Sequence, residues 1–146
     1  MSAPAAVPRT LLDTDIFSEF LRGRNAVVAR RAVQYEAVHG RFTVSAVTLM
    51  ELCSGWQRRG QGARSDAVLQ HIGGWEVLTV DGVVGALAGR MDGDLIRTGQ
   101  PIGIADVLIA ATAVEHGLVL ATGNTAHYQR LQALGYQLQL DDWRSS

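Results

Sequence analysis

The chain has 146 residues, which is enough for one domain and too few for two. Hydrophobic residues make up 47% of it and charged residues 18%, a balance that excludes a disordered protein. The formal charge of −1 excludes a strongly basic nucleic-acid binder of the histone type. All 13 basic residues are arginines, so chemistry that requires a lysine, such as Schiff-base formation or a P-loop, is excluded as well.

Cysteine usage and hydropathy bear on where the protein works. Cys53 is the single cysteine and cannot form an intramolecular disulfide, which indicates a reducing compartment. No apolar run reaches the roughly 18 residues of a membrane span, and residues 1–8 lack the apolar core of a secretory signal. We therefore expect a cytoplasmic protein without membrane contact, with a flexible tail over residues 1–8 and one domain over residues 9–146.

Apolar runs and capping residues alternate along the chain as strands and helices. In chain order they predict strands at 10–12, 42–44, 75–80, 118–121 and 136–140, and helices at 16–21, 25–38, 45–59, 63–72, 81–98, 104–115 and 126–134. Helical stretches between strands act as crossover connections, so the strands lie parallel. The sequence therefore predicts a three-layer α/β/α domain with a mainly parallel sheet of about five strands, and a ligand site beyond the carboxyl ends of those strands.

Acidic side chains follow the strands at these ends. Asp13 and Asp15 come directly after the first strand, Glu51 lies two turns into the helix after the second, and Asp106 lies in the first turn of the helix before the fourth. These acids have no obvious cationic neighbours and would repel one another, so a hard divalent cation such as Mg²⁺ is their natural partner. Such an ion activates water and neutralises phosphate oxygens, which predicts hydrolysis of a phosphate ester.

Each acid also has a simpler explanation. Asp13 is well placed to cap the following helix, and Asp15 to complement the helix dipole from the first turn. A glutamate within a helix, such as Glu51, is usually solvated. Asp106 is the hardest to explain in this way, because it lies on an otherwise apolar helix face and a lone buried carboxylate is costly.

Four segments, taken in order, resemble the motifs of PIN-domain proteins of the VapC toxin type. They are Leu11–Ser18, Val44–Leu52 with Gly55, Pro101–Ala113 and Leu120–Tyr128. The resemblance implies a PIN-like fold and an Mg²⁺-dependent endoribonuclease, in which Mn²⁺ can substitute. It also implies an RNA substrate, a cognate VapB-type antitoxin of a type II toxin–antitoxin system, and a homodimer. The family roles fall on Asp13, Glu51 and Asp106 as catalytic acids, with Asp13 and Asp106 as metal ligands.

The sequence departs from the family pattern at two positions. Asn124 stands where many members have a fourth acid, and Asp15 stands where the family usually has asparagine, so that Asp15 could restore the missing charge. We therefore expect one firmly bound Mg²⁺ in the resting site, with a second entering only with RNA.

Several other residues are weaker candidates for the site. Thr14, Ser45 and Thr122 lie at strand ends, where they could orient carboxylates or water, and Asn124 and His127 could contact the substrate phosphate. Two arginine clusters could hold RNA, although charge on a solvated helix face is the simpler explanation for any single one of them. The clusters are Arg22, Arg24, Arg30 and Arg31, and Arg58, Arg59 and Arg64.

Two other functions compete with this interpretation. A phosphatase of the haloacid-dehalogenase type also ends its first strand in Asp-x-Asp and would use Asp13 as nucleophile, but Phe17 replaces the expected threonine or valine and no lysine is available. A catalytically inactive domain that only binds a partner would have no reason to keep Asp13, Glu51 and Asp106.

Overall fold

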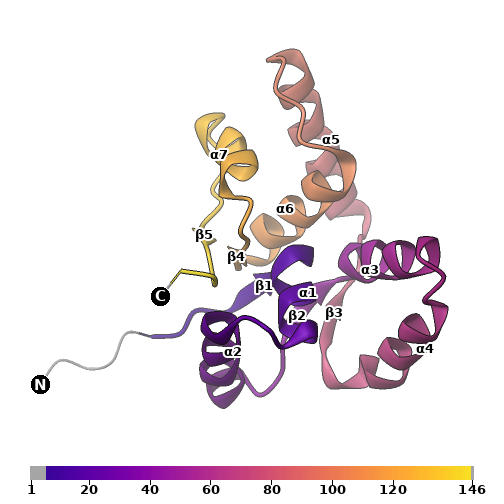
Figure 1. The fold of residues 1–146 in the computed structure, drawn as a ribbon. Coiled ribbons are helices and arrows are strands. Elements are labelled where there is room, and N and C mark those ends of the chain that lie inside the picture. Colours follow the sequence, from indigo (N-terminus) through magenta and orange to yellow (C-terminus); the bar gives the residue numbers. More distant parts are fainter. Residues whose placement is uncertain (1–5, 146) are drawn as a thin grey trace, which may run out of the picture.

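A five-stranded parallel sheet forms the centre of the molecule (Figure 1). The computed structural model describes residues 6–145. The strands lie in the spatial order β3-β2-β1-β4-β5, and their bounds are Thr10–Leu12 for β1, Thr43–Ser45 for β2, Glu76–Leu78 for β3, Val119–Ala121 for β4 and Leu140–Asp141 for β5. This all-parallel sheet confirms the predicted α/β class.

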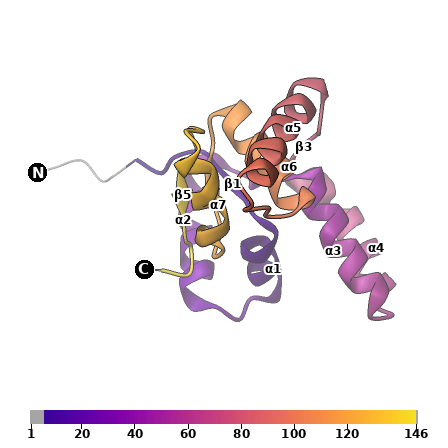
Figure 2. The same ribbon diagram turned by 90° about the horizontal axis from the view of Figure 1, so that it is seen from above.

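Helices connect the strands. They are α1 (Thr14–Arg22), α2 (Ala26–His39), α3 (Ala46–Arg58), α4 (Gly62–His71), α5 (Gly82–Arg97), α6 (Ile104–His116) and α7 (Thr125–Ala133), with a short 3₁₀ turn at Ile72–Gly74. Figure 2 shows α3 and α4 running together as an arm that extends away from the side where the described chain ends.

The sheet separates two hydrophobic cores, as a three-layer domain requires. Alternate residues of β1 point to opposite faces, so Leu11 packs with the side chains of α5, α6 and α7, whereas Leu12 packs with those of α1, α2 and α3. Both leucines are fully buried. The short strands are thus covered on both faces, which explains why they read as continuous apolar runs in the sequence.

Local signals explain most helix ends. The side chains of Asn25, Ser45 and Asp81 accept backbone N–H bonds at the start of α2, α3 and α5, as their positions predict. Gly117 ends α6 with φ 65°, a left-handed conformation that favours glycine.

The last strand differs from its prediction. Residues 136–140 were expected to pair, but only Leu140 and Asp141 pair with β4. Tyr136 and Leu138 pack against the core formed by α5, α6 and α7 without joining the sheet. An apolar pattern alone does not distinguish these two ways of being buried.

The connections from β1 and β4 leave towards opposite sides of the sheet. β1 leads towards β2 and β4 leads towards β5, so the strand order reverses between β1 and β4. The backbone N–H of Asp13 still donates to the carbonyl of Ala121, at 2.9 Å, just beyond both strand ends. This is the point at which open parallel sheets form their ligand crevices.

The N-terminal prediction is only partly within the described chain. Of the predicted tail at residues 1–8, residues 1–5 lie outside the described residues. Val7 packs against the core beneath α2, and its carbonyl oxygen lies 2.8 Å from Nε2 of His39. Between residues 6 and 145, none of the helices combines the length and the apolar character that crossing a membrane would require.

Candidate active site

One pocket at the carboxyl ends of β1 and β4 contains the predicted acids. Its lining includes Asp13, Asp15, Glu51, Asp106 and Asn124, so residues from four separate segments meet there. Thr14 lines the same pocket. Within residues 6–145, Asp13, Glu51 and Asp106 form no ion pair with an arginine. We call this cluster the acid pocket.

Asp13 is the most buried of the acids, with 4% of its surface exposed. It is the N-cap of α1, and its Oδ1 accepts the N–H of Thr14 at 2.8 Å. Burial raises the pKa of Asp13 to about 7, and the negative charges of Asp15 and Asp106 add to this shift. The N-cap of α1 and the most buried acid of the pocket are therefore one residue, and no arginine among residues 6–145 pairs with it.

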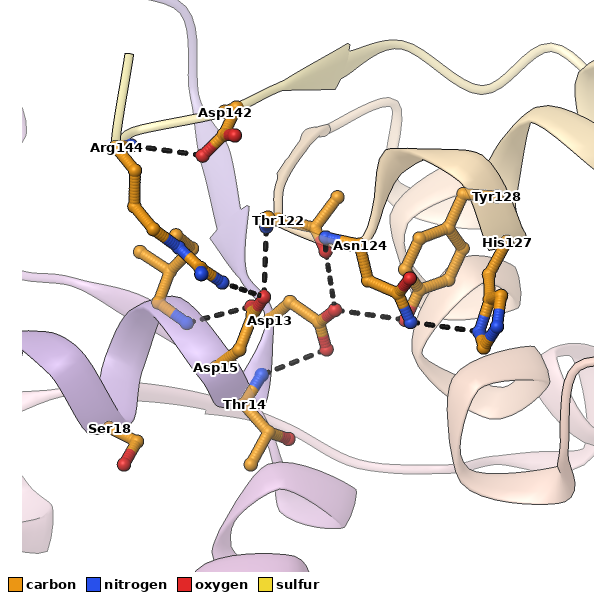
Figure 3. A network of polar contacts seen from close by, with 12 residues as sticks. Asp13, Thr14, Asp15, Ser18, Thr122, Asn124, His127, Tyr128, Asp142 and Arg144 are labelled. Atoms are coloured by element: carbon orange, nitrogen blue, oxygen red, sulfur yellow. Dashed lines mark hydrogen bonds and ion pairs between the residues drawn. The ribbon is translucent and has the colours of Figure 1, made fainter.

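Two hydroxyl groups hold the other oxygen of Asp13 (Figure 3). Oδ2 accepts a hydrogen bond from Thr122 at 2.8 Å and one from Tyr128 at 3.0 Å. The Thr122 hydroxyl in turn accepts the backbone N–H of Asn124 at 3.0 Å. With three donors, the carboxylate of Asp13 is fixed in orientation.

Tyr128 is a site residue that the sequence did not reveal. Its side chain is completely buried, and burial together with the charge of Asp13 raises the pKa of its hydroxyl, which therefore stays protonated and donates. A buried tyrosine one turn into a helix usually reads as a core residue. The available signals were its position directly after His127, a residue already considered for the site, and its place at the end of the Leu120–Tyr128 segment that resembles a family motif.

Glu51 reaches the acid pocket from the middle of α3. The Thr14 hydroxyl donates to Oε1 of Glu51 at 2.6 Å and lies 3.1 Å from the Thr48 hydroxyl. Thr48 is fully buried. Thr14 therefore orients a carboxylate, as its position at the strand end suggested, and Thr48 supports it from one turn earlier on α3.

Asp106, Asn124 and His127 form the opposite wall. Oδ2 of Asp106 lies 3.6 Å from Nδ1 of His127, and the side-chain amide of Asn124 donates to the same nitrogen at 2.8 Å. Asp106, 24% exposed at the side chain, lines the pocket, and His127, 39% exposed, lies just behind Asp106 and Asn124. Asn124 thus lies in the lining of the acid pocket, and His127 lies beside Asn124 and Asp106.

Asp15 lines the acid pocket, but the charge that the sequence suggested it adds there is paired with an arginine. Its Oδ2 accepts a hydrogen bond from the guanidinium of Arg144 at 2.5 Å and one from the backbone N–H of Gly123 at 2.9 Å. Its Oδ1 accepts a hydrogen bond from the N–H of Ile16. Arg144 therefore neutralises Asp15 (Figure 3). An ideal Cβ on Gly123 would lie 2.0 Å from Nη2 of Arg144, so only glycine leaves room for this contact.

Ser45 does not line the acid pocket, although it ends the neighbouring strand. It is fully buried, and its hydroxyl accepts the N–H of Val47 at 3.0 Å as the cap of α3. The hydroxyl therefore has a role in capping α3, and Ser45 lies outside the lining of the acid pocket.

The donor set of the acid pocket suits a hard divalent cation. Every candidate ligand is a carboxylate or amide oxygen, the type that Mg²⁺ prefers. In the part of the chain that the structure describes, no three His, Cys, Asp or Glu side chains are grouped so as to hold a metal by themselves. An ion here would therefore have one or two protein carboxylates and complete its coordination with water and substrate oxygens, an arrangement that Mg²⁺ accepts.

The two arginine clusters separate in the fold. Arg31 pairs with Asp141, and Arg30 lies beside it in a pocket next to Trp143. Arg58 donates to the carbonyl of Ser54 on its own helix. The remaining members line one groove beside the acid pocket; they are Arg22, Arg24, Arg59 and Arg64.

Sequence comparisons agree with this architecture. A model of the PIN domain family matches residues 10–132. The tRNA(fMet)-specific endonuclease VapC of Shigella flexneri is 31% identical over 134 residues, which cover 91% of this chain and 96% of that protein. Ribonuclease VapC10 of Mycobacterium tuberculosis is 32% identical over 124 residues, which cover 85% of this chain and 89% of that protein.

Solved structures of similar chains cover the same extent. A chain from the DNA-bound VapBC of Salmonella typhimurium has a TM-score of 0.77 and 27% identity, covering 94% of this chain and 99% of that one. A chain from VapBC-1 of nontypeable Haemophilus influenzae has a TM-score of 0.74 and 26% identity, covering 92% of this chain and 97% of that one. The similarity therefore includes the sheet and the helices on both of its faces.

Proposed function

The chain belongs to the PIN domain family, and from this premise we propose that it is a ribonuclease of the VapC type, the toxin of a toxin–antitoxin pair. It hydrolyses phosphodiester bonds of RNA. The observation that supports this most directly is the acid pocket, where Asp13, Glu51 and Asp106 meet without an arginine partner among residues 6–145.

The phosphatase alternative has no support. The family match covers residues 10–132, and the curated relatives over the same range are named ribonucleases or endonucleases. Asp13 is also held by three hydrogen-bond donors. These donors stabilise the charge of a carboxylate and so weaken it as a nucleophile.

We infer that Asp13, Glu51 and Asp106 are the catalytic acids, with Asp13 and Asp106 as metal ligands. PIN-domain VapC ribonucleases depend on a divalent metal, and the all-oxygen donor set favours Mg²⁺, for which Mn²⁺ can substitute. When bound, the ion supplies a water of lowered pKa and positive charge for the phosphate oxygens.

The protein's own groups prepare the site for this chemistry. Thr122, Tyr128 and the N–H of Thr14 keep the Asp13 carboxylate in one orientation, which avoids reorganisation during the reaction. Thr14 holds the Glu51 carboxylate in the lining of the pocket, where a general base has to lie to take a proton from the attacking water. Asn124 and His127 present an amide and an imidazole at the open side, where a phosphate oxygen can accept a hydrogen bond.

Purified protein tests the proposal directly. Structured RNA and para-nitrophenyl phosphate are each incubated with the chain, with Mg²⁺ or with EDTA, and products are separated on a gel or read by absorbance. We expect RNA cleavage that EDTA and Asp13→Asn abolish. Release of phosphate from the small ester without RNA cleavage would contradict the ribonuclease and favour the phosphatase.

The number of metal ions is a separate proposal. Asn124 adds no charge, and Arg144 neutralises Asp15, so the pocket has too little negative charge for two tight sites in the absence of RNA. Calorimetric titration with Mg²⁺ is expected to give one site, and a second in the presence of an RNA analogue that cannot be cleaved. Two equivalent tight sites without RNA would contradict this proposal.

A VapB-type antitoxin and a second copy of the chain are the proposed protein partners. The structural relatives include VapBC complexes. A short reading frame next to the gene would encode the antitoxin, and its co-expression should suppress RNA cleavage.

For the homodimer, apolar residues at the surface of α2 offer contact area, among them Val33 with 70% and Val38 with 59% exposed. Light scattering that gives a monomeric mass at micromolar concentration would contradict the dimer.

A further inference from the structure

A groove with four arginines lies between the end of α1 and the arm formed by α3 and α4. Arg22 is the last residue of α1, and Arg24 lies in the turn that follows. From the arm come Arg59, at the end of α3, and Arg64, in the first turn of α4. We call this feature the arginine groove. It is built from two turns that are distant in the sequence and meet only in the fold.

The cations of the arginine groove are free of acidic partners. Among residues 6–145, none of its four arginines forms an ion pair, whereas Arg9, Arg31 and Arg144 all do. Arg22 donates to the Ser18 hydroxyl at 3.1 Å, and no carboxylate lines the groove. Trp56 and Val68, each 8% exposed, contribute apolar surface to its lining. The groove therefore presents guanidinium groups that are available to an external anion.

The arginine groove is continuous with the acid pocket. Ser18 and Arg22 line both, so one depression contains carboxylates at one end and arginines at the other. The α1 helix runs alongside this change of charge, from Asp15 in its first turn to Arg22 in its last. A ligand that bridges the two ends must bind the acid pocket through a divalent cation and present negative groups to the arginines.

We propose that the arginine groove binds the phosphodiester backbone of RNA on one side of the bond that is cut. This inference rests on the proposed ribonuclease function, because it assumes that one RNA phosphate occupies the acid pocket. The neighbouring phosphates then reach guanidinium groups, which bind phosphate oxygens in pairs. Contacts of this kind are independent of base sequence, so the groove adds affinity for longer RNA without selecting the sequence.

An acidic protein segment is the competing occupant. Such a segment would satisfy the arginines, but where it continued into the acid pocket its carboxylates would meet Asp13, Glu51 and Asp106. RNA fits both ends of the depression at once. One phosphate binds the metal ion together with the carboxylates, and the neighbouring phosphates bind the arginines. The continuity of the two regions therefore favours RNA.

The test removes two groove arginines that do not line the acid pocket. R59A/R64A is compared with R90A/R97A, a pair of exposed arginines on α5, which packs against the other face of the sheet. Both variants lose two positive charges, so a general charge effect is matched. Melting temperatures verify that each variant is folded.

The substrates are a fluorescein-labelled 20-nucleotide RNA that the wild-type chain cuts and a tetranucleotide spanning its cleavage site. For R59A/R64A we expect at least a tenfold higher KM for the 20-mer, with kcat and the hydrolysis of the tetranucleotide unchanged. The slope of log KM against log salt concentration should fall by about 1.4, because each phosphate contact to single-stranded RNA contributes about 0.7. R59K/R64K keeps the positive charge, so it should retain the wild-type salt slope. Its KM for the 20-mer should lie between those of the wild type and R59A/R64A.

Fluorescence anisotropy in EDTA separates this inference from the ribonuclease function. Without metal, the wild-type chain and R90A/R97A should bind the 20-mer equally, and R59A/R64A at least tenfold more weakly, whether or not cleavage is ever observed. Equal binding by all three proteins would overturn the groove proposal and leave the ribonuclease intact. Unchanged RNA binding with weakened binding of a decaglutamate peptide would also overturn it, in favour of an acidic protein partner.

Discussion

The acid pocket and the arginine groove share Ser18 and Arg22, yet they hold their charges in different ways. In the pocket, the Asp13 carboxylate is buried and fixed by three hydrogen bonds. In the groove, the arginines are exposed and free of ion pairs with any described carboxylate. The central carboxylate of the pocket is buried and fixed, whereas the arginines of the groove are solvated.

This difference separates the two contributions to activity. Buried charges interact strongly and respond little to salt, whereas exposed charges are screened over about 8–10 Å at physiological ionic strength. We therefore expect the acid pocket to determine kcat and the metal requirement. The arginine groove should determine KM and its salt dependence. The following changes sharpen or break this division.

The largest effect is expected from the acid pocket itself. Asp106→Asn keeps the size of the side chain but removes a charge from the proposed metal site. The loss in kcat should exceed the 10- to 100-fold that removal of an outer-shell partner typically causes. Single-turnover RNA cleavage measures it, with Asp92→Asn on α5 as the control. A change confined to KM would break the division.

The next effect concerns a hydrogen bond beneath the acid. Tyr128→Phe removes one donor to Oδ2 of Asp13 and leaves the Thr122 bond in place. We expect roughly 10- to 100-fold weaker Mg²⁺ binding by calorimetry, with cleavage restored at high Mg²⁺. Tyr136→Phe is a matched control, because Tyr136 donates to Asp94 outside the site. Equal metal affinity in both variants would mean that Tyr128 only fills the core.

A stability measurement tests the buried charge. Because burial raises the pKa of Asp13 from 3.8 to about 7, the folded chain binds a proton that the unfolded chain releases between these values. The free energy of unfolding contributed by Asp13 therefore falls as pH rises from about 4 to 7.

Asp13→Asn should remove this dependence. In EDTA it should match the wild type near pH 4 and be more stable by roughly 2–4 kcal/mol at pH 8, read from melting temperatures. Mg²⁺ should stabilise only the wild type at pH 8. The measured quantity is the difference in stability between Asp13→Asn and the wild type. A difference that is no larger at pH 8 than at pH 4 would refute the buried-charge account.

The smallest effect is expected at the exposed rim of the pocket. Arg144→Ala removes a partly exposed ion pair with Asp15, worth about 0–1 kcal/mol. Gly123→Ala should displace the same guanidinium, because the new Cβ would lie 2.0 Å from it. The double variant should therefore be no less stable than the more destabilised single variant, measured by chemical denaturation. Additive losses would show that Gly123 matters for another reason.

The elements that the sequence predicted well have local causes. The leucines of β1 form an apolar run, and Asn25 and Asp81 mark helix starts through bonds within three residues. Asp106 stood out because a carboxylate interrupts an apolar helix face. Patterns of this kind need no knowledge of the rest of the fold.

The features that the sequence did not predict depend on contacts between distant segments. Asp15 was taken as a free charge because Arg144 follows it by 129 positions. Tyr128 was not recognised because its hydroxyl meets Asp13 across 115 positions. The four arginines of the groove could not be separated from their sequence neighbours until α1 and the α3–α4 arm were placed side by side. No local pattern contains this information.

The distance between Asp13 and its supporting hydroxyls also has a consequence for synthesis. Thr122 follows Asp13 by 109 positions. At about 5–20 residues per second, a ribosome needs roughly 5–20 seconds to add that stretch. During this time the nascent chain has its first acid but not the loop and helix that hold it. The Asp13 carboxylate can therefore acquire its fixed orientation only after Thr122 and Tyr128 have been added to the chain.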